Sequence, residues 1–156
     1  MQRIAASLAL IKQDKSTSYD RLNEAHEALL MRLWNASCPG VPLVSRVSEQ
    51  WKTLGFQGND PATDFRGMGL LGLRHLVFFA EKYSTGWREL LVSQARRKER
   101  QYPVSVAGIN LTYLLVNEVF LLGEPGRPMA SMQIDRTSVD NLLADSEDAF
   151  AEVLVV

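Results

Sequence analysis

The residues best suited to chemistry are three charged side chains in the stretch DPATDFRG, residues 60–67. Arg66 is permanently charged and carries five N–H donors in a planar fork. It can bond Asp64 or free backbone carbonyls and so hold its own loop together. Standing at a junction between loop and helix, it can equally reach an anionic partner, with Asp60 and Asp64 beside it. Residue types and spacing leave both roles open.

The residue sets that usually carry catalysis are absent. There are only two histidines, His26 and His75, and neither has a second metal ligand three or four residues further on. We interpret both as hydrogen-bonded packing residues. The run GMGLLG at 67–72 matches a dinucleotide-binding G-x-G-x-x-G, but no strand is expected before it and no acidic residue follows at the ribose distance. The sequence therefore predicts no metal, no cofactor and no active site of its own.

Length and composition favour one globular domain over residues 1–156. The chain is 46% hydrophobic and 22% charged with a formal net charge of −1, which argues against disorder and against a nucleic-acid partner. Its single cysteine, Cys38, cannot form an internal disulfide, and we interpret it as a packing residue. One cysteine suits a reducing compartment, so we expect a cytoplasmic protein.

A basic cluster follows the helix expected around Trp87. It could contact phosphates, a membrane or an acidic protein face. It could also be a solvated helix end whose cations suit the negative end of the helix dipole. We favour the solvated helix end for its four members, which are Arg96, Arg97, Lys98 and Arg100.

Helical periodicity dominates the first half of the chain. Residues 1–15 form an amphipathic pattern with Ile4, Leu8 and Ile11 on one face. Caps at 16–18 predict a second helix from Leu22 to Trp34. Proline and glycine make residues 38–46 an extended connection, after which Ser48 is expected to cap a short helix that ends at Gly55. Residues 58–64 are expected to be a loop.

The second half predicts a central helix flanked by others. Residues 68–83 are apolar almost all round, and Gly69 and Gly72 would let a neighbouring backbone approach. Residues 104–122 are interpreted as a buried helix rather than a membrane span, and a final helix is expected from Asp140. Between residues 68–83 and 104–122, a helix from Ser84 or Thr85 should place Trp87, Leu90, Leu91 and Ala95 inward and Arg88, Glu89 and Gln94 outward. We expect an all-α domain of about six to eight helices.

The segment WKTLGFQGNDPATDFRGMGLLGL, residues 51–73, resembles the signature of the ELMO domain family. That signature runs Trp, three residues, Gly-Phe-Gln, three residues, Pro, one residue, Thr-Asp-Phe-Arg-Gly, one residue and Gly, followed by spaced Leu, Leu and Phe. Likeness also extends to the flanking segments around 26–34 and 102–112, and so covers most of the chain. The residues in register are Trp51, Gly55, Phe56, Gln57, Pro61, Thr63, Asp64, Phe65, Arg66, Gly67, Gly69, Leu73, Leu76 and Phe79.

The resemblance implies an all-α fold and one of two roles. In one branch of the family the domain activates GTP hydrolysis by Arf-family and Arf-like small GTPases, with the motif arginine as a finger. In the other it belongs to a scaffold that works with Dock-type exchange factors on Rac and lacks the finger. Arg66 occupies the finger position, and 156 residues leave no room for the scaffold's further domains. We therefore expect a GTPase activator acting near membranes through its GTPase, which would itself hold GTP and Mg²⁺.

The resemblance also implies roles for single residues. Arg66 would act in trans, positioned by Asp64 or nearby carbonyls, while Gln57 would contact the GTPase or satisfy loop backbone. The supporting or partner-contacting loop would further include Asp60, Pro61, Thr63, Phe65 and Gly67. The aromatic residues Trp51, Phe56 and Phe65 are expected to be core anchors. The motif core would comprise Trp51, Gly55, Phe56, Gly69, Leu73, Leu76 and Phe79.

Overall fold

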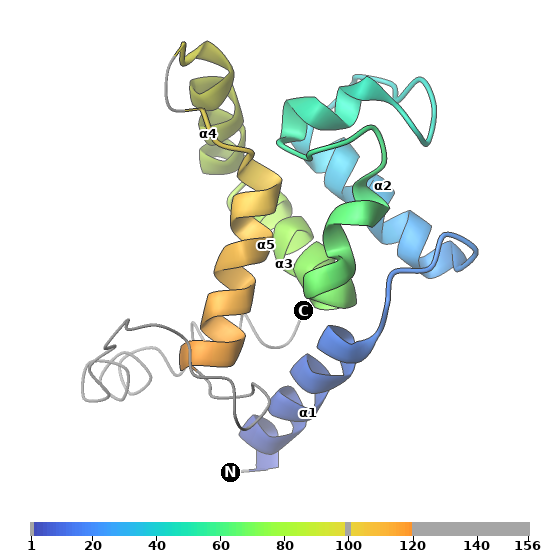
Figure 1. Cartoon of the computed structure of the whole chain (residues 1–156), viewed down its shortest axis with the longest axis vertical. Coiled ribbons are helices and arrows are strands. Elements are labelled where there is room, and N and C mark those ends of the chain that lie inside the picture. The colour runs from blue at the N-terminus through green and yellow to red at the C-terminus, as the bar shows by residue number, and fades with distance from the viewer. Residues whose placement is uncertain (1, 99–100, 120–156) are drawn as a thin grey trace.

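The computed structural model describes residues 2–98 and 101–119, and every regular element in these ranges is helical. The predicted all-α fold is confirmed (Figure 1). The helix expected from Asp140 lies outside the described residues. In chain order the elements are α1 (Gln2–Ser16), α2 (Glu24–Ser37), the 3₁₀ helices η1 (Glu49–Leu54) and η2 (Pro61–Gly67), α3 (Gly69–Lys82), α4 (Ser84–Arg96), α5 (Val104–Leu114) and a π-helical turn η3 (Leu115–Val119).

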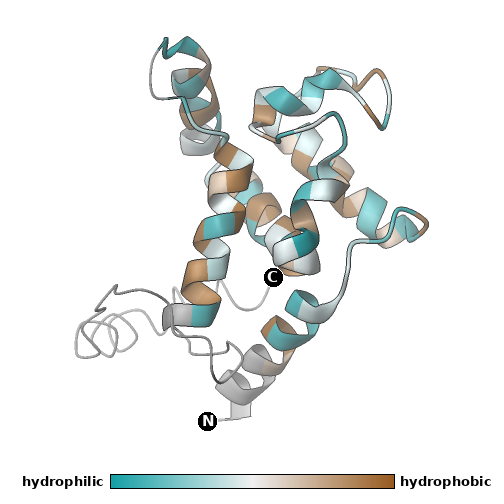
Figure 2. Cartoon of the chain, viewed as in Figure 1, coloured by the Kyte–Doolittle hydropathy of each residue, from teal (hydrophilic) through white to brown (hydrophobic). Residues whose placement is uncertain are grey.

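Helix α3 is central, as its all-round apolar pattern predicts. It packs against α1, α2, α4 and α5, and in Figure 1 it runs between α2 and α5. Apolar and polar segments alternate around the ribbons of the surrounding helices, as expected of helices that bury one face each (Figure 2). The α3 residues that are buried are Gly69, Leu70, Leu71, Gly72, Leu73, Leu76, Val77 and Ala80.

The start of the second helix differs from the prediction. Helix α2 is capped by Asn23, whose side-chain oxygen accepts from the backbone N–H groups of Ala25 and His26 at 2.9 and 3.3 Å. The hydroxyls of Ser16 and Thr17 instead donate back to a carbonyl of α1 and finish that helix. Leu22 lies outside the helix and is 92% exposed. The prediction placed the capping residues at 16–18, whereas the helix is capped by Asn23.

The inward and outward faces of α4 were also assigned partly wrongly. Gln94 is buried at 6% exposure, whereas Ala95 is exposed. The carboxamide oxygen of Gln94 accepts from the backbone N–H of Tyr102 at 3.3 Å, so the buried polar atom has a partner. Trp87 and Leu91 are buried as predicted. The segment that follows α4 folds back over the helix end, which reverses the faces there.

The helix after Pro103 begins at Val104 and continues through the π-helical turn. Within the described residues, no helix combines the length and the apolar composition needed to cross a bilayer. Helix α5 packs against α3, and residues 120–122 of the expected helix lie outside the described residues. Its interior contact with α3 includes a hydrogen bond between Nδ1 of His75 and the hydroxyl of Thr112, 3.0 Å apart. Because the Thr112 hydroxyl donates its only hydrogen to the Gly108 carbonyl, the histidine Nδ1 must be the donor.

Burial of His75 should make stability depend on pH. Burial lowers the pKa of His75 to about 4, so the folded protein keeps the ring neutral. The unfolded chain takes up a proton below pH about 6.5 while the folded one does not, and stability is therefore lost as the pH falls. We expect a loss of about 2 kcal/mol between pH about 7.5 and 5. Urea unfolding should show this loss in the parent and not in His75→Gln. Parallel pH profiles for the two proteins would contradict it.

Candidate functional site

The candidate site is the 3₁₀ helix η2, which carries most of the motif. Residues 58–64 were expected to be a loop, but Asp60 caps a helix over Pro61–Gly67 by accepting from the N–H of Ala62 at 3.1 Å. Proline in the first turn has no N–H to satisfy and its φ is already helical, so the cap and the proline together start a helix. The turn-forming residues Asp60 and Pro61 therefore start a short helix instead of forming a loop.

One side of η2 is buried and the other faces solvent. Pro61 and Phe65 are buried, with Phe65 only 1% exposed. Thr63, Arg66 and Gly67 are exposed. Helix η2 therefore presents Arg66 to solvent, while the preceding residue, Phe65, packs into the core.

A line of aromatic rings anchors η2. Phe65 packs against Tyr19 and Phe56, with ring centroids 5.3 and 5.8 Å apart. Phe56 continues edge-on to Trp51, which in turn meets Trp34. Such edge-to-face pairs contribute about 0.5–1.5 kcal/mol each beyond their burial. The prediction that Trp51, Phe56 and Phe65 are core anchors is confirmed.

Arg66 lies on the exposed side and is held at its base. Its Nε donates to the carbonyl of Thr63 at 2.9 Å, one turn back in η2. Within the described residues no ion pair involves Arg66. The bond fixes the start of the guanidinium and leaves its outer edge, which has the remaining donors, for a partner.

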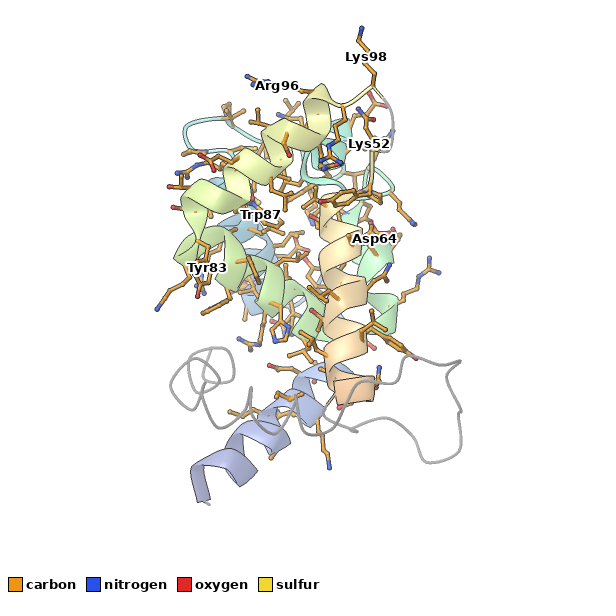
Figure 3. All side chains as sticks on the ribbon, turned by 90° about the vertical axis from the view of Figure 1, so that its left-hand side faces the viewer. Lys52, Asp64, Tyr83, Trp87, Arg96 and Lys98 are labelled. Atoms are coloured by element: carbon orange, nitrogen blue, oxygen red, sulfur yellow. The ribbon has the colours of Figure 1, made fainter. Side chains whose placement is uncertain are left out.

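Two alternatives were expected for positioning Arg66, Asp64 or a nearby carbonyl, and the structure has the carbonyl. Oδ2 of Asp64 accepts from the backbone N–H of Gln57 at 3.0 Å and does not pair with Arg66. A nearby carbonyl, that of Thr63, positions the arginine instead. Asp64 therefore ties η2 to the segment that follows η1, and Figure 3 places it beside α5. The side chain of Gln57 is exposed next to this link.

Arg46 holds the start of η2, and the sequence did not point to it. Its Nε donates to Glu27 of α2 at 2.6 Å, its Nη1 to Asp60 at 3.1 Å and its Nη2 to the Tyr19 hydroxyl at 3.3 Å. Arg21 also pairs with Asp60. Burial and the hydrogen bond to Glu27 raise the pKa of Tyr19, so its hydroxyl stays protonated and neutral. The partners of Arg46 lie 14 to 27 residues away, too far for any local spacing rule.

The motif glycines differ in what they do. Gly69 has φ +55°, and a Cβ there would lie 2.7 Å from the carbonyl oxygen of Lys15 and closer still to that of Thr17. The neighbouring amide of Leu70 donates to the Thr17 carbonyl at 2.9 Å. The predicted close backbone approach is therefore present at Gly69. A Cβ at Gly72 would meet only side chains, those of Met68 at 3.4 Å and Ile109 at 3.5 Å, so the predicted backbone approach is not present there.

Another motif glycine also allows a close approach. Gly55 ends η1 with φ +83° as predicted, and a Cβ there would meet the backbone of Pro103 and Val104. Gly67, by contrast, has open space around it.

Phe79 does not belong to the core. Leu73 and Leu76 are buried as expected, but Phe79 is 51% exposed. It lies near the end of α3, where its ring contacts those of Phe78 and Tyr83. Leu76 and Ala80 define the inward face at this end, and Phe79 falls to one side of it.

Two further side chains that could do chemistry are His26 and Cys38. Nδ1 of His26 accepts from the backbone N–H of Asp20 at 3.0 Å, a packing role as predicted. Burial raises the pKa of the Cys38 thiol, which makes it a poor nucleophile. In residues 2–98 and 101–119, no group of three or more His, Cys, Asp or Glu side chains is placed to hold a metal ion. Arg96, Arg97 and Lys98 are exposed, and Arg100 lies outside the described residues.

Several known proteins are similar to this chain over most of its length. The chain is 50% identical over 116 residues to ELMO domain-containing protein A of Dictyostelium discoideum, covering 74% of this chain and 12% of that protein. It is 45% identical over 102 residues to ELMO domain-containing protein 2 of Homo sapiens, covering 65% of this chain and 34% of that one. ELMO domain-containing protein 1 of Bos taurus is 39% identical over 126 residues, covering 70% and 39%.

The chain thus spans from about an eighth to about two fifths of the length of these curated relatives. The model of the ELMO/CED-12 family matches residues 9–156, nearly the whole sequence. Together, the motif, the helical fold and these matches show that the chain belongs to the ELMO/CED-12 family.

Proposed function

We propose that this domain activates GTP hydrolysis by a small GTPase of the Arf or Arf-like class, with Arg66 as an arginine finger supplied in trans. The observation that carries the proposal is the placement of Arg66. It is exposed on a helix whose other side is fixed in the core, and its Nε is held by the Thr63 carbonyl. A finger needs this combination of reach and fixed position.

The proposed catalytic effect depends on the positive charge of the Arg66 guanidinium. In GTP hydrolysis negative charge develops on the phosphate oxygens in the transition state, and a guanidinium placed there stabilises it more than it stabilises the ground state. Arginine fingers contribute roughly 10³ to 10⁵ in rate. The nucleotide, its Mg²⁺ and the attacking water would all belong to the GTPase. The domain would supply the cation and the surface that delivers it.

A second candidate is a non-catalytic interaction module. The hydrogen bond from Arg66 to the Thr63 carbonyl favours this module. An arginine that stabilises its own helix has a structural role that requires no contact with a nucleotide phosphate. The exposed residues Gln57, Thr63 and Gly67 could then bind a GTPase or a scaffold that works with a Dock-type exchange factor on Rac. In this case the domain would bind and leave the rate of GTP hydrolysis unchanged.

Single-turnover GTP hydrolysis separates the two candidates. A panel of purified Arf, Arf-like and Rac GTPases loaded with radiolabelled GTP is mixed with the domain at increasing concentration. The proposal predicts saturable acceleration by at least about 10³ for an Arf or Arf-like member, in the range known for arginine fingers. Binding without acceleration across the Arf and Arf-like members would support the interaction module instead.

A further inference from the structure

A second surface lies at the end of the molecule where α4 finishes. A groove of about 330 Å³ runs between η1, the last turns of α4 and the segment before α5. Figure 3 shows Lys52 below the end of α4, from which Arg96 projects to the left and Lys98 upward. The groove is lined by Lys52, Thr53, Gly55, Phe56, Leu91, Gln94, Ala95, Gln101, Tyr102, Pro103 and Val104.

The walls of the groove are held by bonds between distant segments. Gln94 accepts from the N–H of Tyr102, which fixes the segment before α5 to α4. The Ser105 hydroxyl donates to the Leu54 carbonyl at 2.6 Å, and the N–H of Val106 donates to the Gly55 carbonyl. These bonds join η1 to the start of α5. The groove is therefore preformed, and a ligand need not order it.

The groove combines an apolar floor with a basic rim. Phe56, Leu91 and Val104 are buried and line it. No acidic residue is among its lining residues, whereas Lys52 is. The cations Arg96, Arg97 and Lys98 follow directly after Ala95, and all three are exposed.

The helix dipole does not account for this charge. One cation in the last turn of α4 is enough to interact favourably with the negative end of the helix dipole, and Arg96 provides that cation. Lys52 lies on another element, η1, and its pairing with Glu49 is long, at 3.4 Å, and highly exposed. Such surface pairs contribute little. The chain as a whole has a net charge of −1, so this end is a local excess of positive charge.

We propose that this groove binds a short acidic peptide segment with one apolar anchor residue. The apolar side chain would lie on Phe56, Leu91 and Val104, and flanking Asp or Glu residues would face Lys52 on one side and Arg96 to Lys98 on the other. A volume of about 330 Å³ suits one or two side chains rather than a folded domain. A membrane surface would interact with the basic rim but would not fill the groove. A peptide with an apolar anchor accounts for both the basic rim and the groove. The proposal does not depend on the GTPase activity.

The test uses fluorescence anisotropy with a fluorescein-labelled peptide that has one leucine between two runs of glutamates. We expect binding on the order of 100 µM that weakens with salt. Lys52→Glu should weaken binding at least about tenfold, since it reverses a charge on the rim. Ala95→Trp should abolish binding by filling the groove. The matched controls, Lys12→Glu on α1 and Ser93→Trp on the exposed side of α4, should bind as the parent does.

Three results would overturn the proposal. One is no binding by the parent protein. Another is that a peptide with glycine in place of leucine binds as well as the leucine peptide, and that Ala95→Trp has no effect on binding. Binding would then come from diffuse charge attraction and not from the groove. The last is binding to phosphatidylserine vesicles that survives Ala95→Trp while the peptide does not bind, which would assign the basic end to a membrane. Circular dichroism should show the same helix content in every variant.

Discussion

Replacing Arg66 by lysine should reduce the activation of GTP hydrolysis by at least about 10³ and leave the fold intact. Lysine keeps the charge but not the planar fork that bonds two phosphate oxygens at once. A factor of 10³ corresponds to about 4 kcal/mol of lost transition-state stabilisation. Because Arg66 is exposed, the free energy of unfolding should change by less than about 0.5 kcal/mol. Single-turnover hydrolysis and urea unfolding measure the two quantities.

Arg32→Lys is the matched control for this substitution. Arg32 is also exposed but lies on α2, where it pairs with Glu81. It should retain full activation. If Arg66→Lys activates like the parent, the finger role is lost. If it unfolds the domain, the arginine is a structural residue of η2.

Replacing Gly69 by alanine should destabilise the domain by about 3 kcal/mol or more. An alanine there would need φ near +55°, which costs on the order of 1–3 kcal/mol, and its Cβ would press on the carbonyls at the end of α1. Those carbonyls belong to the backbone and cannot turn away as a side chain would. For a domain of this size the loss corresponds to a fall in Tm of about 6–12 °C. Thermal unfolding followed by circular dichroism measures it.

Gly67→Ala provides the comparison within the same motif. Gly67 is exposed and a Cβ there meets nothing within 4 Å, so stability should change by less than about 0.5 kcal/mol. Equal losses for the two variants would mean that the close approach of α1 to Gly69 is not what requires glycine. If Gly69→Ala is as stable as the parent protein, α1 can shift away from residue 69 without loss of stability.

The sequence predicted most of the elements because their signals are local. Periodic apolar residues located α3 and α5, and Ser48 and Gly55 marked both ends of η1. The motif also identified Arg66 together with the aromatic anchor next to it. In each case the physical cause lies within a few residues of the effect. Periodicity and capping can therefore be recognised before the fold is known.

The parts that were missed depend on contacts between distant segments. Arg46 joins α2 to the cap of η2, and no spacing rule connects it with Glu27 or Asp60. The buried side chain of Gln94 has its partner in the N–H of Tyr102, beyond the end of α4. For Arg66 the sequence left Asp64 and nearby carbonyls open as partners, and the structure has the Thr63 carbonyl, while Asp64 accepts from the amide of Gln57. Charge and proximity along the chain do not decide which donor a carboxylate meets.

The anchoring of η2 has a consequence for the entropy of complex formation. Fixing the backbone of a free loop costs about 1–2 kcal/mol per residue, so a flexible segment of seven residues would lose roughly 7–14 kcal/mol on docking. Here Phe65 and the Asp60 cap have already imposed that order during folding. A partner has only to immobilise the outer torsions of Arg66, at a cost of about 2 kcal/mol at most. Encounter should then resemble the meeting of two rigid surfaces, with little coupled ordering of the motif backbone.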